Sequence, residues 1–68
     1  MSKISTSVRF QTGNGIGHEI TVCRYAEQVE GAITHKRTDV ESEPKVSPIS
    51  REGAILLIKA LECVFDIP

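Results

Sequence analysis

The alternation of apolar and polar residues near the N-terminus most narrowly limits what this chain can fold into. Between Lys3 and Gln11, every second residue is apolar or threonine, and the residues between them are polar or charged. Side chains of a strand point alternately to its two faces, so a period of two predicts a strand with one face against a core. We therefore expect a strand over residues 3–11, with Phe10 on its inner face.

The same reasoning predicts two further strands. One is expected over residues 19–26, with Ile20 on the inner face, because β-branched residues recur there with the same period. A less regular one is expected over residues 29–38, with Ile33 inward. Val40 belongs either to the tail of that strand or to a short fourth strand.

A helix is expected to end the chain. Segment 42–48 is rich in proline and serine and lacks periodicity, so it is expected to be a connector. A helix is predicted over about residues 49–65, capped either by Ser47 with Pro48 in the first helical position or by Ser50. We expect all 68 residues to form one α+β domain, an antiparallel meander of three or four strands packed against one C-terminal α-helix.

Three glycines at alternate positions, Gly13, Gly15 and Gly17, raise the question of a nucleotide-binding loop. Such a loop leads from a strand into a helix, because the phosphate is held by free amides at the helix N-terminus. A strand follows here, so the segment predicts a hairpin loop instead. Pairing Phe10 with Ile20 requires an odd-numbered loop of three or five residues centred on Gly15.

The composition argues against several classes of function. Eight basic and nine acidic residues give a net charge of -1, without the basic excess that favours nucleic acid as a partner. No apolar run is long enough for a membrane span or a signal-peptide core, so a cytoplasmic protein is expected.

The residue types needed for catalysis or metal binding are sparse. Cys23 and Cys63 are too widely spaced for a zinc motif or a disulfide framework, and we expect both to be free thiols. His18 is expected to point away from Cys23, and neither it nor His35 has a partner that would make a nucleophile. The sequence therefore predicts neither an enzyme nor a metal or cofactor site.

The predicted helix carries more apolar surface than one sheet can cover. At 100° per residue its charged side chains gather in an arc of about 100°, and the apolar and small ones cover about 220°. A stripe of about 100° would suffice to cover one sheet. Either a small sheet curls around the helix, or one flank contacts another protein. The residues expected to make this contact are Ile55, Leu56, Ile58, Lys59 and Glu62, together with Ile16 in the loop, which is either folded back on the sheet or offered to a partner.

These observations favour a non-enzymatic protein-binding module that acts by steric docking. A domain this small, without disulfides or a structural metal, often gains stability from a partner subunit, so a homodimer or a subunit of a larger assembly is expected. In size and general shape the chain resembles many small phage and mobile-element proteins that block a bacterial enzyme or immune complex, anti-CRISPR proteins among them. The alternative is a small nucleic-acid-binding or regulatory protein that uses the polar outer face of the sheet, with Lys3, Arg9, Tyr25 and Lys36.

Overall fold

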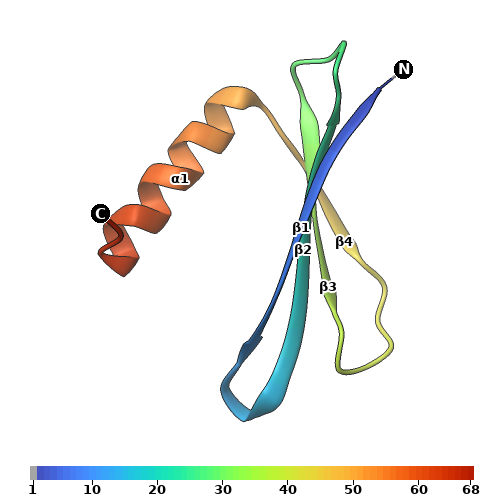
Figure 1. Cartoon of the computed structure of the whole chain (residues 1–68), viewed down its shortest axis with the longest axis vertical. Helices are drawn as coiled ribbons and strands as arrows, with labels where there is room; N and C mark the ends of the chain where they lie inside the picture. The colour runs from blue at the N-terminus through green and yellow to red at the C-terminus, as the bar shows by residue number, and fades with distance from the viewer. Residues whose placement is uncertain (1) are drawn as a thin grey trace.

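The computed structural model describes residues 2–68, which form four strands and one α-helix (Figure 1). The elements are β1 (Lys3–Thr12), β2 (Ile16–Tyr25), β3 (Gly31–Arg37), β4 (Lys45–Ile49) and α1 (Arg51–Phe65). The strands pair in sequential order, β1-β2-β3-β4, and every pair is antiparallel. The α+β class, with an antiparallel meander and one C-terminal helix, is confirmed.

The prediction of a connector over residues 42–48 and of a helix from about residue 49 was wrong where the fourth strand lies, because β4 covers Lys45–Ile49. β4 begins at Lys45, and its Pro48 lies opposite Ala32 of β3. Proline is tolerated there because β4 is an edge strand, which has a ladder partner on one side. Val40 lies in the loop between β3 and β4 and is exposed, so it belongs to neither strand.

The loop between β1 and β2 has three residues, an odd number as predicted, but the register differs from the predicted one. Phe10 lies opposite His18 rather than Ile20, and the loop is centred on Asn14. The expected centre at Gly15 was wrong because Asn14 (φ 67°) and Gly15 (φ 75°) both adopt the left-handed region, which asparagine and glycine enter most readily. The shift is two residues, so each side chain keeps its predicted face.

Two other glycines are required by close contact between neighbouring segments. A Cβ at Gly17 would collide with the side chain of Thr38, which follows β3. A Cβ at Gly31 would collide with the carbonyl oxygen of Cys23 on β2. A Cβ at Gly13, in contrast, would point into open space. Of the three loop glycines, Gly15 and Gly17 are therefore required by the path of the backbone, and Gly13 is not.

The register divides the side chains of the sheet between two faces, because residues directly opposite each other share a face. We call one of them the apolar face; it carries Ile4, Thr6, Val8, Phe10, Ile16, His18, Ile20, Val22, Ile33, His35 and Ile49, together with the basic residues Arg24, Arg37 and Lys45. We call the other the polar face; it carries Lys3, Ser5, Ser7, Arg9, Glu19, Thr21, Tyr25, Thr34 and Lys36. The alternation seen in the sequence is thus realised across β1, β2 and β3.

The helix is capped at both ends by local hydrogen bonds. Ser50 is its N-cap, and the Ser50 hydroxyl accepts a hydrogen bond from the Gly53 amide at 3.1 Å. This decides between the two predicted caps, since Ser47 lies within β4. At the other end Asp66 is left-handed, and its amide donates to the Glu62 carbonyl. α1 therefore ends at Phe65, where the sequence predicted.

The helix stands away from the sheet instead of lying across it (Figure 1). It leaves β4 after the single residue Ser50, and within residues 2–68 no strand packs along its length. Only Gly53 and Ala54 of α1 are half-buried, and every other residue of the helix is exposed. The apolar side of the helix is therefore left without the cover that the sequence reasoning assigned to the sheet.

As a result, a single copy has no buried hydrophobic side chain among residues 2–68. Every residue of β1 is exposed, and on the apolar face Val8 and Val22 are 54% and 47% exposed. The chain exposes 5672 Å², whereas a folded monomer of 7.5 kDa is expected to expose about 4,200 Å². The fold thus presents two apolar surfaces that nothing in the same chain covers.

Candidate protein-interaction surface

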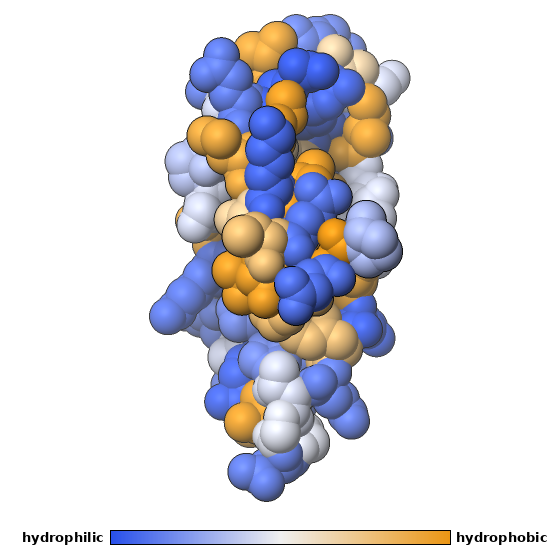
Figure 2. Space-filling view, turned by 90° about the vertical axis from the view of Figure 1, so that its left-hand side faces the viewer, coloured by the Kyte–Doolittle hydropathy of each residue, from blue (hydrophilic) through white to orange (hydrophobic). Residues whose placement is uncertain are grey.

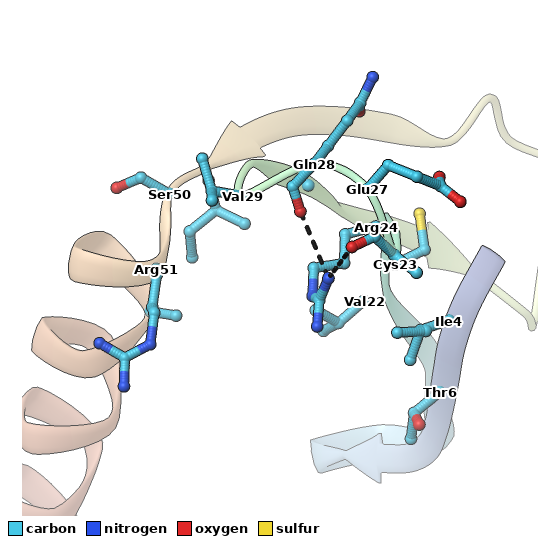
Figure 3. A pocket seen from close by; sticks show the side chains of 14 residues that line it. Ile4, Thr6, Val22, Cys23, Arg24, Glu27, Gln28, Val29, Ser50 and Arg51 are labelled. Atoms are coloured by element: carbon cyan, nitrogen blue, oxygen red, sulfur yellow. Dashed lines mark hydrogen bonds between the residues drawn. The ribbon is translucent and has the colours of Figure 1, made fainter. Parts of the chain in front are cut away.

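A groove of about 540 Å³ lies where α1 leaves the sheet (Figure 3). Its sheet side is formed by residues of the apolar face, including Ile4, Val22 and Ile49, and its helix side by Arg51 and Ala54. The groove is open to solvent, so apolar side chains of another protein can enter it.

Arg24 forms part of the groove and holds the adjacent turn in place. Its guanidinium donates to the carbonyl oxygen of Tyr25 at 3.4 Å and to those of Ala26 and Gln28 at 3.3 Å. The last two hydrogen bonds are drawn in Figure 3. These carbonyls belong to the end of β2 and the turn that leads to β3. The guanidinium thereby stabilises the turn and leaves a positive charge at the end of the apolar face.

The predicted contact residues of the helix are exposed on one side of α1. Ile55, Leu56 and Ile58 are 38%, 66% and 55% exposed, and Lys59 and Glu62 are exposed with them. At 100° per residue the five lie within an arc of about 160° that includes the charged side chains. We call these five residues the docking flank.

The remaining predicted contact residue, Ile16, lies apart from the docking flank. It is the first residue of β2, opposite Thr12, and is half-buried on the apolar face. The structure therefore places Ile16 in the strand ladder, and of the two predicted positions for its side chain it has the one on the sheet.

The opposite side of α1 is purely apolar or small. We call it the apolar centre; it consists of Gly53, Ala54, Leu57, Ala60, Leu61 and Val64. Leu57, Leu61 and Val64 are all exposed. Figure 2, viewed from the side that carries α1, shows hydrophobic residues at the surface between charged ones.

Two histidines that the sequence left unpartnered meet on the apolar face. His18 Nδ1 and His35 Nε2 are 2.9 Å apart, and the two rings are stacked. The ring of Phe10 stacks on the other side of His18, and Thr12 Oγ1 lies 2.8 Å from His18 Nε2. The two histidines meet because the register of β2 and β3 brings them to neighbouring positions on one face. The only sign of this in the sequence is that each histidine lies two residues from an isoleucine predicted to point inward, Ile20 or Ile33.

The residues of the nucleic-acid alternative do share the polar face. Arg9 Nε, however, lies 2.6 Å from Glu19 Oε2, and Glu19 is also the pairing partner of Lys36 across β2 and β3. One carboxylate thus lies between the two cations. Lys3 lies opposite Tyr25 at the other end of the face. Glu19 therefore reduces the positive charge around Arg9 and Lys36, the two cations that would contact a phosphate backbone.

An ion pair closes the loop after β3. The Arg37 guanidinium donates to both carboxylate oxygens of Asp39, with Nε at 2.9 Å from Oδ1. This hydrogen bond lowers the pKa of Asp39 to about 2 and raises the pKa of Arg37. The ion pair therefore joins the last residue of β3 to the loop that follows it.

Other kinds of site are not seen in the described part of the chain. Among residues 2–68 no three His, Cys, Asp or Glu side chains are grouped closely enough to hold a metal ion. Cys23 and Cys63 are free thiols on β2 and α1, and His18 and Cys23 lie on opposite faces of β2. No helix among these residues has the length and apolarity needed to cross a membrane.

Comparison with protein-family models, with curated proteins and with solved structures finds no match to this chain. The two apolar surfaces and the docking flank are therefore the features on which a functional proposal must rest.

Proposed function

We propose that this chain is a non-enzymatic protein-binding module that acts by steric docking through the docking flank of α1. The observation that carries the proposal is the exposure of Ile55, Leu56 and Ile58 on a helix that stands clear of its own sheet. Exposed apolar side chains that are bordered by charged ones are typical of protein-interaction sites. Lys59 and Glu62 lie among them and supply polar contacts that fix the register of a partner.

The form of this activity that we propose is inhibition. A domain of this size acts on a larger protein by occupying a surface that the target needs, without chemistry of its own. A bacterial enzyme or immune complex is the proposed target class, by analogy with small phage and mobile-element inhibitors of similar size and α+β architecture. A cytoplasmic location belongs to the same proposal.

The test is affinity capture from a bacterial lysate followed by mass spectrometry, with matched variants. We expect a protein retained by the wild-type chain and by Ser5→Glu, which adds a charge on the polar face, but lost with Ile55→Glu and with Ile58→Glu. Failure to find any protein with this pattern would refute the proposal.

The salt dependence of binding distinguishes protein docking through α1 from nucleic-acid binding through the polar face. Docking through apolar side chains should change little between about 50 mM and about 200 mM salt, whereas contacts to a nucleic-acid backbone weaken steeply over that range. Retention of nucleic acid that falls with salt and with Lys36→Glu would favour the polar face as the functional surface.

A further inference from the structure

We propose that two copies of this chain form a symmetric homodimer in which α1 of each copy packs its apolar centre on the apolar face of the other. Such a contact is made twice in a two-fold dimer, once by each helix. It uses neither Ile55 nor the other docking-flank residues, so it goes beyond the function proposed above and can stand or fall without it.

The exposed area matches what a stable dimer needs. A single copy exposes 5672 Å², which exceeds the area expected for a folded chain of 7.5 kDa by about 1,400 Å². Burying that excess on both copies would remove about 2,800 Å² in total, within the range of about 2,000 to 5,000 Å² found for obligate homodimers. The uncovered surface is thus of the size of a subunit interface.

Each copy carries both halves of this interface, and this identifies the partner as a second copy. The apolar face lacks a cover, with Val8, Val22 and Phe10 all exposed. The apolar centre of α1 also lacks a cover, with Leu57 and Leu61 exposed. An unrelated partner would need to supply both a helix and a sheet face, whereas a second copy supplies both at once.

The dimensions of the two halves agree. α1 has 15 residues and is therefore about 22 Å long. β3 has 7 residues and spans about 23 Å, and four strands spaced about 4.8 Å apart present a face about 14 Å wide between the outer strands. A helix about 10 Å in diameter fits along this face and covers most of it.

The proposed dimer is tested by two variants, each of which should fail to dimerise alone but should dimerise when the two are mixed. Val22→Lys puts a cation on the apolar face, and Leu57→Glu puts an anion in the apolar centre. Either change places charges in both copies of the interface, so each variant is expected to sediment as a monomer at micromolar concentration, where the wild type is a dimer.

Mixing the two variants in equal amounts is expected to restore the dimer. In the mixed dimer one interface brings the new ammonium against the new carboxylate, and the other interface has the wild-type pair, Val22 against Leu57. We expect at least a tenfold lower dissociation constant for the mixture than for either variant alone. Far-UV circular dichroism follows folding in the same samples, so a variant that unfolds alone but refolds on mixing also supports the proposal.

Two control variants place the same charges outside the interface. Ser5→Lys, on the polar face, and Ile55→Glu, in the docking flank, are expected to leave the dimer intact. Loss of a captured target with Ile55→Glu, while the dimer persists, would show that the two surfaces act separately.

Three results would overturn the proposal. The wild type could be monomeric up to about 100 μM, the dimer could be indifferent to both interface variants, or the mixture could fail to recover. The last outcome would mean that the helix does not cross to the sheet of the other copy, as in a dimer made by helix against helix or by the edges of β1. None of these results affects the capture experiment for the docking flank.

Discussion

Dilution is the simplest perturbation of this protein, because a chain that buries its apolar surface only in a dimer must lose stability as its concentration falls. An unfolded chain of 7.5 kDa exposes about 10,900 Å². A single folded copy, with 5672 Å² exposed, buries just under half of that, whereas a domain of about 60 residues buries about 60%. The isolated copy therefore lacks the burial of a stable domain, and folding should be coupled to association.

The expected shift follows from mass action. When a folded dimer unfolds to two chains, each tenfold change in protein concentration changes the apparent free energy of unfolding by about 1.4 kcal/mol of dimer. The urea dependence for a chain this small is about 1 kcal/mol/M, or about 2 kcal/mol/M for a dimer. The urea midpoint should therefore rise by about 0.7 M for each tenfold increase in concentration.

The assay is urea unfolding followed by far-UV circular dichroism at about 1, 10 and 100 μM. The helix and sheet signals should move together, because neither surface is covered without the other. A midpoint that is the same at all three concentrations would refute the coupling, and with it the reasoning that an uncovered apolar face prevents a stable monomer.

Three further predictions concern local features. Ser50→Ala removes the hydroxyl that accepts from the Gly53 amide, so it should destabilise the protein by about 1 kcal/mol in urea unfolding; an unchanged midpoint would exclude the cap. Gly31→Ala should cost about 1 to 3 kcal/mol because the new Cβ meets the backbone of β2, whereas Gly13→Ala, in open space, should not show that loss in the same experiment. The carboxyl of Asp39 should titrate by NMR with a pKa of about 2, so its contribution to stability is complete above the ordinary carboxyl pKa and is lost as the pH falls through about 2. In Arg37→Gln the midpoint should return toward the ordinary aspartate value of about 3.9, and a midpoint that stays near 2 would contradict the role of the guanidinium.

The sequence predicts those parts of the fold that depend on neighbouring residues. The strand of residues 3–11 follows from its alternation. The helix end at Phe65 follows from Asp66, whose negative charge is unfavourable at the C-terminal end of a helix dipole, and from Pro68 two residues later. The two faces of the sheet also follow, because the period of two fixes which side chains point together. These features are settled within about ten residues of chain, which is the range that a pattern describes.

The features that the sequence could not predict depend on longer distances. The centre of the first hairpin depends on whether Asn14 or Gly15 begins the left-handed turn, and both residues allow it. The His18–His35 pair depends on the register of β2 and β3, and the sequence does not fix the length of the turn between these strands. The position of α1 is set by what covers its apolar side, and a hydrophobic pattern states that a cover is needed without stating which chain supplies it.

Ser50 has a mechanical consequence, because it is at once the link between β4 and α1 and the cap of the helix. Its hydroxyl moves with the first turn of α1, so a rotation about the bonds just before Ser50 can redirect the helix without breaking the cap. A helix about 22 Å long then acts as a lever, and a rotation of about 10° at its base moves its far end by about 4 Å. The docking flank can thus be re-aimed by a small change at a single residue, while the ladder of the sheet stays as it is.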